Sequence, residues 1–249
     1  MTVSVPLERS EEARATMIEL FPEGFEERVD RAELELTAYT ARADAVPRLE
    51  ALGRVSEGPV ALGWEDAWKG FHKPVAIGPL WIGPPWETPE PGSTPIVIDP
   101  GQAFGTGSHP TTRLCLELLL ELEPTGLVDL GCGSGVLAVA AAKLGFAPVL
   151  ALDNDDLSVE ATRANAADNG VAVEVKRADV LADALPDVEA AVANIARAPV
   201  EQAAERFGGR ILIASGYLEA ERPQPPGWRE IERRVVEGWA ADMLGRTAD

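Results

Sequence analysis

From residue 96 onward, short apolar runs alternate with segments of helical periodicity, and this alternation restricts the chain to few folds. Alternating strands and helices predict βαβ units, and strands that are almost continuously apolar predict a parallel sheet covered on both faces. We therefore expect residues 96–249 to form a doubly wound α/β domain. Five apolar runs have the length of buried strands: residues 127–130, 149–153, 173–176, 188–193 and 211–214. Stretches such as 136–144 and 157–169 between them are typical of helices.

The C-terminal part of this domain has another pattern. Residues 228–244 suit two strands on either side of Glu237 and Gly238, a pair that favours a tight turn. We expect an antiparallel hairpin that closes one edge of the sheet. With it the sheet has seven strands, mostly parallel, in a Rossmann-like arrangement.

Residues 1–63 carry shorter units that alternate between strand and helix. The expected strands are residues 3–5, 25–29 and 33–39, and the expected helices are residues 10–20 and 44–52. Residues 33–39 alternate with period two, as a half-buried antiparallel strand does, and Asp30 and Arg31 suit a hairpin turn. A small α+β domain is the prediction for this part of the chain.

Residues 64–95 are rich in tryptophan and proline. Trp64 and Trp68 lie one helical turn apart, and seven prolines between residues 74 and 95 oppose a long helix. We interpret the segment as a linker whose tryptophans anchor two domains against each other. Alternatively, the tryptophans could belong to a surface that binds the substrate.

Acidic residues exceed basic residues by a wide margin. The 249 residues include 41 acidic and 22 basic ones, which gives a net charge of −19. Such a charge argues against direct binding to nucleic acid or to anionic lipid, and it favours a basic partner. Solubility alone is the other explanation of this charge.

Cysteine and histidine are scarce. The chain has Cys115, Cys132, His72 and His109, too few for a disulfide framework, a cysteine zinc site or a histidine-rich metal site. The longest apolar stretch, residues 136–152, is interrupted by lysine, glycine and proline, and no secretory segment opens the chain. We expect a cytoplasmic protein without a metal or a membrane span.

A glycine-rich turn follows the first predicted strand of the α/β domain. Gly131, Gly133 and Gly135 alternate with other residues in the sequence DLGCGSG. Without Cβ atoms, these positions permit a ligand to lie across the turn at the carboxyl ends of the strands. Tight packing of helix on strand also favours glycine, so the turn alone does not define a ligand.

The spacing of the glycines separates nucleotide classes. Val136 stands where a dinucleotide fingerprint beginning at Gly131 requires glycine or alanine, and the Gly-Lys-Ser/Thr of a P-loop is absent. The pattern after an acidic strand end suits the amino-acid half of S-adenosyl-L-methionine instead. Asp129 is then a candidate partner, directly or through water, for the ammonium group of that ligand.

Asp153 ends the next predicted strand, 22 residues beyond Gly131. A carboxylate at this distance can accept hydrogen bonds from both hydroxyls of a ribose. Capping of the following helix is the alternative role, for which Asp155 and Asp156 are better placed. We therefore expect a nucleoside ligand.

Two polar residues lie at the carboxyl ends of the later predicted strands. Asp179 could accept a hydrogen bond from the adenine amino group, or it could lie in a solvated turn. Asn194 could place its carbonyl oxygen beside the transferable methyl group, or it could be a turn asparagine. In both cases the sequence leaves the two roles open.

Residues 99–112 form a loop rich in glycine and hydroxyl groups before a leucine-rich helix at residues 113–122. Pro110 favours the first turn of that helix, so a loop and an N-cap would explain part of the pattern. We interpret the loop as a flap over a cofactor, in which Phe104 supplies an apolar cover and Thr112 a hydroxyl group.

These motifs, in this order, resemble the ribosomal protein L11 methyltransferase family, known as PrmA. The resemblance covers the chain from about residue 64 to its end, including residues 78–86 and 237–239. It implies a class I S-adenosyl-L-methionine-dependent methyltransferase joined to a small ferredoxin-like domain that recognises the ribosomal protein. The family's cofactor positions correspond to Thr112, Gly131, Asp153 and Asn194. Phe104 and Thr106 match its flap.

The sequence departs from the family pattern at two places. Asn154, Asp155 and Asp156 replace an apolar-Asp-Pro sequence, and residues 197–199 read Arg-Ala-Pro after Asn194-Ile195-Ala196. The first 60 residues match only in pattern. The identity of the substrate is therefore less constrained than that of the cofactor.

Methyl transfer to a protein amine implies few catalytic groups. No dedicated general base is evident, so we expect catalysis by proximity and alignment, with Asn194 orienting the amine. A related methyltransferase acting on another protein lysine or on a small molecule is one alternative. A binding module that has lost catalysis is another, and Val136 disfavours an NAD-dependent oxidoreductase.

Overall fold

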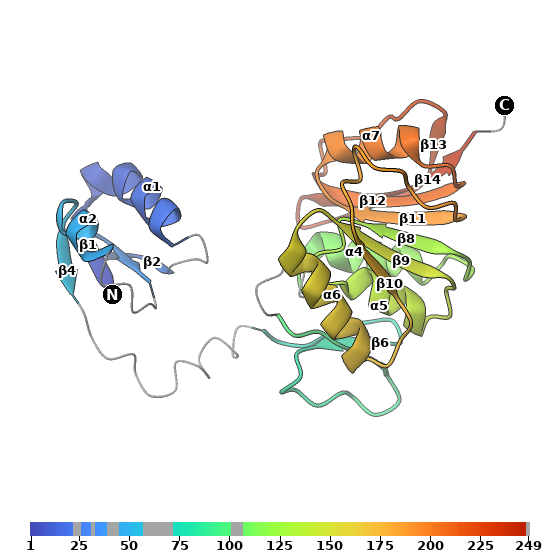
Figure 1. The fold of residues 1–249 in the computed structure, drawn as a ribbon, viewed down its shortest axis with the longest axis horizontal. Coiled ribbons are helices and arrows are strands. Elements are labelled where there is room, and N and C mark those ends of the chain that lie inside the picture. The colour runs from blue at the N-terminus through green and yellow to red at the C-terminus, as the bar shows by residue number, and fades with distance from the viewer. Residues whose placement is uncertain (22–25, 31–32, 39–44, 57–71, 101–106, 248–249) are drawn as a thin grey trace. The chain divides into compact units, whose positions relative to one another are not determined.

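The computed structural model describes residues 1–21, 26–30, 33–38, 45–56, 72–100 and 107–247. The chain divides into two compact units, Met1–Trp68 and Lys69–Asp249. The buried apolar residues of unit 1 form one cluster, and those of unit 2 form two. Figure 1 shows the helices and strands of each unit.

Unit 1 is a four-stranded antiparallel sheet with two helices. Its strands follow the order β2-β3-β1-β4, and a β-α-β-β-α-β sequence of elements builds them. Side chains that alternate along β1 and β3, among them Val3, Val5, Leu34 and Leu36, fill the core together with residues of both helices. The elements are β1 (Thr2–Pro6), α1 (Ser10–Leu20), β2 (Glu26–Asp30), β3 (Glu33–Thr37), α2 (Val46–Glu50) and β4 (Arg54–Ser56).

The five elements expected in unit 1 are present, and α1 has the predicted bounds. The strand β4 was not predicted, because three residues give no recognisable period. Arg31, assigned to the hairpin turn, lies outside the described residues.

Unit 2 contains a seven-stranded sheet of order β10-β9-β8-β11-β12-β14-β13. The first five strands of this order pair in parallel, and β14 and β13 are antiparallel. The strands are β8 (Leu127–Leu130), β9 (Val149–Asp153), β10 (Glu174–Arg177), β11 (Ala190–Asn194), β12 (Ile211–Leu218), β13 (Trp228–Val236) and β14 (Trp239–Arg246). The helices are α4 (Pro110–Leu119), α5 (Val136–Lys143), α6 (Asp156–Asp168) and α7 (Arg197–Arg206).

Alternate residues of the central strands enter two separate cores. Leu127 and Val192 belong to the cluster that contains α4 and α5, whereas Val128 and Ala193 belong to the cluster that contains α7. Successive side chains of a strand point to opposite faces, so a mainly apolar strand supplies both cores.

Residues 75–97 differ from the predicted linker. They form a three-stranded sheet of β5 (Val75–Ile77), β6 (Leu80–Gly83) and β7 (Thr94–Val97), with β5–β6 antiparallel and β6–β7 parallel. Leu80, Ile82 and Ile96 enter the same core as α4 and α5. All but one of the prolines in these residues lie outside the strands, and Pro95 lies on an edge strand, where a missing N–H is tolerated. Trp64 and Trp68 lie outside the described residues.

The predicted C-terminal hairpin is confirmed. Val236 pairs with Trp239, and the two residues between them, Glu237 and Gly238, have φ angles of 52° and 79°. Positive φ at both central positions is the geometry of the two-residue turn that matches the twist of a hairpin.

None of the helices in the described part of the chain has both the length and the apolar character that a membrane span requires.

Candidate functional site

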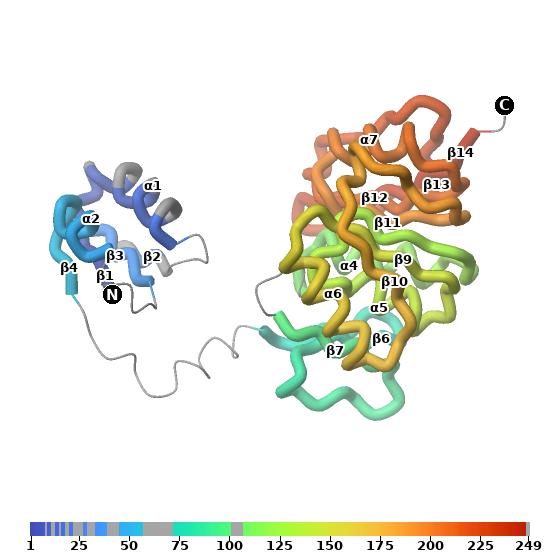
Figure 2. Tube along the Cα trace, viewed as in Figure 1, coloured from blue at the N-terminus to red at the C-terminus, as the bar shows by residue number. Residues whose placement is uncertain are grey.

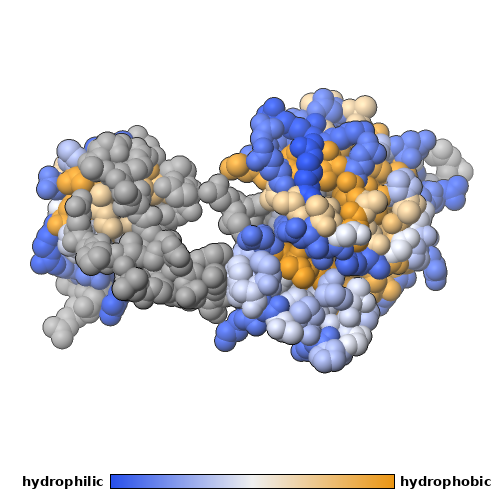
Figure 3. Space-filling view, turned by 60° about the horizontal axis from the view of Figure 1, so that its bottom comes forward, coloured by the Kyte–Doolittle hydropathy of each residue, from blue (hydrophilic) through white to orange (hydrophobic). Residues whose placement is uncertain are grey.

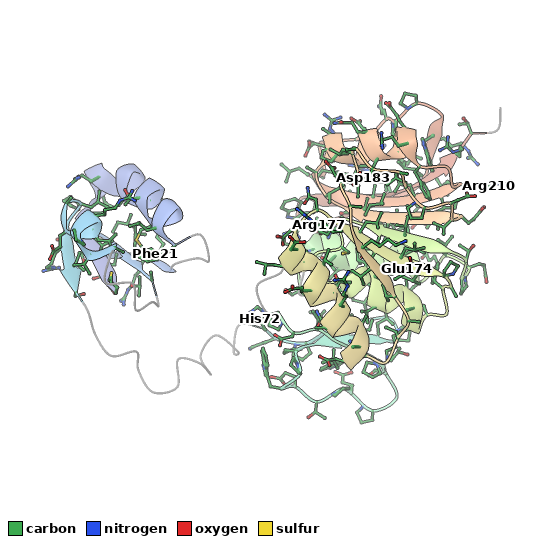
Figure 4. All side chains as sticks on the ribbon, viewed as in Figure 1. Phe21, His72, Glu174, Arg177, Asp183 and Arg210 are labelled. Atoms are coloured by element: carbon green, nitrogen blue, oxygen red, sulfur yellow. The ribbon has the colours of Figure 1, made fainter. Side chains whose placement is uncertain are left out.

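A cavity of about 360 Å³ lies at the carboxyl ends of β8, β9, β10 and β11. Figure 4 marks this edge of the sheet with Arg177 at the end of β10, whereas Glu174 and Arg210 mark the opposite edge. Ligands of doubly wound sheets bind at this edge. The cavity is lined by Thr112, Gly131, Cys132, Gly133, Val136, Leu137, Asp153, Asn154, Ser158, Ala178, Asp179, Val180, Leu181, Asn194, Ile195 and Pro199.

The glycine-rich turn contributes two of its three glycines to the cavity. Gly131 and Gly133 line it, with φ angles of 80° and 53°. A Cβ atom at Gly131 would come within 2.6 Å of Ile195 Cγ2, so this position also needs glycine for packing.

Gly135 is not at the cavity. Its φ angle is 81°, and an added Cβ atom would lie 2.7 Å from Thr162 Cγ2 of α6. The packing explanation that the sequence left open therefore accounts for Gly135.

Asp153 lies at the end of β9, and each of its carboxylate oxygens accepts one backbone hydrogen bond. Oδ2 accepts from the N–H of Gly133 at 3.0 Å, and Oδ1 accepts from the N–H of Asp155 at 3.0 Å. A carboxylate has about four acceptor positions, so both oxygens retain capacity for a ligand. Asp155, rather than Asp153, caps α6 by accepting from the N–H of Ser158, a bond that lowers the pKa of Asp155.

Asn194 and Thr112 meet at the cavity from different elements. Asn194 ends β11, and its Nδ2 donates to Oγ1 of Thr112, in the first turn of α4, at 3.1 Å. This bond uses the amide nitrogen and leaves the carbonyl oxygen to a ligand. His109 caps α4 through its ring nitrogen Nδ1, which accepts from the N–H of Thr111.

Asp179 lines the cavity and also forms a turn. Its Oδ1 accepts from the N–H of Leu181 at 2.9 Å, and its own N–H donates to Asp183 Oδ2 at 2.9 Å. The turn role is therefore present, and because Asp179 also lines the cavity, the adenine role stays a prediction.

Asp129 does not line the cavity, which corrects its direct role as a partner of the ligand. Its side chain is buried, and Oδ2 accepts from the N–H of Ala138 in the first turn of α5 at 3.1 Å. Oδ1 has no hydrogen-bond partner among the described residues. Burial raises the pKa of Asp129 to about 7, against the opposing effect of the Ala138 bond.

Phe104 and Thr106, expected in a flap, lie outside the described residues. The structure adds several apolar and small lining residues that the sequence argument missed, among them Ile195 and Pro199. Ile195 directly follows β11, and Pro199 lies in the first turn of α7, so the signal was their position at the strand-to-helix connection. Cys132 was missed as well; its Sγ lies 3.3 Å from Thr162 Oγ1, and burial raises the pKa of its thiol.

The charge of the lining distinguishes between ligands. Two carboxylates, Asp153 and Asp179, face the cavity, and none of the described lining residues is lysine, arginine or histidine. This lining does not favour a pyrophosphate, and it favours a ligand with positive charge and hydrogen-bond donors. The described residues also contain no cluster of three or more histidine, cysteine or acidic groups that could hold a metal.

Comparison with known proteins identifies the family. A model of the family described as ribosomal protein L11 methyltransferase (PrmA) matches residues 19–223. The chain belongs to this family. The match begins within α1 of unit 1, so it extends further toward the N-terminus than the motifs indicated.

Individual PrmA proteins are similar over most of this chain. A ribosomal protein L11 methyltransferase of Exiguobacterium is 38% identical over 221 residues, which is 79% of this chain and 70% of the relative. The protein of that name from Aeromonas hydrophila is 42% identical over 198 residues, 74% of this chain and 68% of the relative. A crystal structure of ribosomal protein L11 methylase from Lactobacillus delbrueckii has a TM-score of 0.63 and 30% identity, covering 70% of this chain and 99% of that one.

Membership of the PrmA family confirms the enzyme class predicted from the motifs. The protein is an α/β methyltransferase, and its cofactor is S-adenosyl-L-methionine. The residues present fit that cofactor, because the cavity combines hydrogen-bond acceptors with a lining free of basic groups among the described residues.

Proposed function

We propose that this protein transfers methyl groups from S-adenosyl-L-methionine to amino groups of ribosomal protein L11. One observation carries the proposal: Thr112, Gly131, Asp153 and Asn194 come from four separate segments and converge on one cavity. These are the positions at which the sequence matches the cofactor residues of the PrmA family.

The hydrogen-bond acceptors that line the cavity support a binding role for each residue. Asp153 would accept hydrogen bonds from the ribose hydroxyls, and Gly131 and Gly133 leave room for the amino-acid portion. Asp179 would accept from the adenine amino group. S-adenosyl-L-methionine, when bound, supplies a methyl group activated by its positively charged sulfur.

The attacking amine must be neutral. A lysine in water has a pKa of about 10.4, so its neutral form at pH 7 costs roughly 4–5 kcal/mol. Partial desolvation in the cavity disfavours the ammonium form. The amide nitrogen of Asn194 is held by Thr112, and its carbonyl oxygen would accept a hydrogen bond from the amine and orient the lone pair. None of the lining residues is assigned as a general base, so alignment is the main source of acceleration.

Unit 1 is the proposed recognition domain. Its β-α-β-β-α-β order is that of ferredoxin-like domains. The net charge of −19 favours a basic protein partner over nucleic acid, and a ribosomal protein in the cytoplasm fits this preference. We place the catalytic domain in residues 69–249, because the 75–97 sheet packs on its core.

The experiment is methylation of purified ribosomal protein L11 with isotope-labelled S-adenosyl-L-methionine, followed by intact-mass and peptide mass spectrometry. We expect mass increases of whole methyl groups on lysines or on the N-terminus. Asn194→Ala should reduce methylation more strongly than it weakens cofactor binding, because Asn194 is one of the proposed cofactor residues and is also proposed to orient the amine. An unmodified L11 with a functional cofactor site would overturn the substrate assignment and favour another amine. Absence of cofactor binding would overturn the enzymatic function itself.

A further inference from the structure

Helix α6 contacts two other segments through one buried asparagine. Asn165 is 2% exposed; its Oδ1 accepts from the N–H of Asp99 at 3.0 Å, and its Nδ2 donates to the carbonyl oxygen of Ser134 at 2.9 Å. Ser134 belongs to the glycine-rich turn, and Asp99 follows β7. One side chain thus joins two segments that are 35 residues apart in the sequence.

A second asparagine, one helical turn along, contacts only one of these segments. Asn169 Oδ1 accepts from the N–H of Val97 at 2.9 Å, and its Nδ2 donates to the carbonyl oxygens of Val97 at 2.6 Å and of Asn165 at 2.7 Å. Figure 2 shows β7 beside α6, as these bonds require. Asn169 fixes the end of β7, and among the described residues it makes no hydrogen bond to the glycine-rich turn.

The glycine-rich turn receives a second bond from the same helix. Thr162 Oγ1 donates to the carbonyl oxygen of Gly133 at 2.9 Å. Two successive carbonyl groups of the turn, at Gly133 and Ser134, are therefore satisfied by side chains of α6. Glycine residues contribute no side chains that could restrict the backbone, so the shape of this turn depends on bonds of this kind.

We propose that Asn165 is a positioning residue for the cofactor: it holds the glycine-rich turn in its binding shape and ties that turn to the backbone of Asp99. It does not line the cavity and acts through Ser134. A turn that is ordered before binding loses less conformational freedom when the ligand arrives, so affinity rises. The inference rests on the proposed cofactor site.

The test uses two chemically identical substitutions in the full-length protein. Asn165→Asp keeps the acceptor for Asp99 and removes the donor to Ser134, whereas the control Asn169→Asp keeps the acceptor for Val97 and removes donors that do not contact the turn. Binding of S-adenosylhomocysteine is measured by calorimetry, and amide exchange of residues 131–136 is measured without ligand. A thermal melt of each variant reports on folding.

We expect Asn165→Asp to raise the Kd for S-adenosylhomocysteine at least about tenfold, the equivalent of one lost hydrogen bond. Exchange in residues 131–136 should accelerate, and KM for the cofactor should rise more than kcat falls. Asn169→Asp should leave the Kd within about twofold of the wild type, even where its melting temperature drops.

Equal effects of both variants on the Kd, or an unchanged Kd in Asn165→Asp, would overturn the inference. If Asn165→Asp does not fold, Asn165→Ser, which introduces no buried charge, takes its place. A wild-type protein that does not bind S-adenosylhomocysteine would contradict the proposed function instead. In that case the exchange of residues 131–136 alone decides whether Asn165 holds the turn.

Discussion

Asn194 Nδ2 donates a 3.1 Å hydrogen bond to Thr112 Oγ1, and this bond joins the end of β11 to the first turn of α4. Thr112 is buried, so its hydroxyl has little competition from water. The bond determines which end of the Asn194 amide faces the cavity, and the mechanism proposed for methyl transfer needs the carbonyl end.

Thr112→Val should therefore lower kcat/KM without unfolding the protein. Valine has the same shape but accepts no hydrogen bond, so the Asn194 amide can rotate. We expect a decrease of about tenfold in kcat/KM, the equivalent of one neutral hydrogen bond. Thr112→Ser keeps the hydroxyl and should remain within about threefold of the wild type. Equal rates for the valine and wild-type proteins in steady-state methylation would contradict this role.

Asp153 should determine cofactor affinity more strongly than its neighbours. Asp153→Asn removes the charge that strengthens hydrogen bonds from ribose hydroxyls, and we expect the Kd for S-adenosylhomocysteine to rise about 10- to 100-fold. The matched control is Asp156→Asn, because Asp156 is exposed and pairs with Arg177 at 3.3 Å outside the cavity lining. Calorimetry measures the Kd for S-adenosylhomocysteine of both variants. Equal Kd values would show that Asp153 does not bind the ribose.

The buried carboxyl of Asp129 should make stability depend on pH. Its pKa is about 7 in the native state and about 3.8 in the unfolded chain. Between these values the native state binds more protons, so the free energy of unfolding decreases as the pH rises, by up to about 1.4 kcal/mol per pH unit.

Asp129→Asn removes this titration while keeping an acceptor for the Ala138 N–H. Relative to the wild type, the variant should therefore gain stability as the pH rises from 4 toward 7. Urea denaturation across that range measures the difference. A constant difference between the two proteins would show that Asp129 does not retain a proton in the native state.

An ion pair inside the C-terminal hairpin should matter for folding. Arg233 Nη1 donates to both carboxylate oxygens of Asp242, at 2.9 and 2.7 Å, and both side chains are largely buried. Arg233→Met would leave Asp242 buried without its cation, at a cost of about 3–5 kcal/mol. Arg229→Met, at an exposed position of the same strand, should change the free energy of unfolding by less than about 0.5 kcal/mol. Urea denaturation that gave the two variants equal stability would contradict this prediction.

The regular elements of unit 2 could be predicted because their sequence patterns are local. Leu127–Leu130 and Val149–Asp153 have the predicted bounds, since each is an apolar run that ends at a polar or glycine residue. The Glu237-Gly238 turn was predictable from residue type alone. By contrast, β5, β6 and β7 have three or four residues each, and tertiary packing against α4 and α5, rather than periodicity, makes them strands.

Part of the site could be predicted, because the carboxyl ends of parallel strands lie together at one end of the sheet. Asp153, Asp179 and Asn194 follow parallel strands, and the structure brings all three to one cavity. Spacing along the chain does not reveal which side of a turn faces the ligand. For that reason Asp129 and Gly135, part of the same motif, proved to face α5 and α6 instead.

A crystal structure with S-adenosylhomocysteine tests the central claim most directly. We predict that the ligand occupies the cavity at the ends of β8–β11, with its ribose hydroxyls within hydrogen-bond distance of the Asp153 carboxylate. Density for the ligand elsewhere, or a ribose that does not contact Asp153, would contradict the assignment of this cavity as the methyl-donor site.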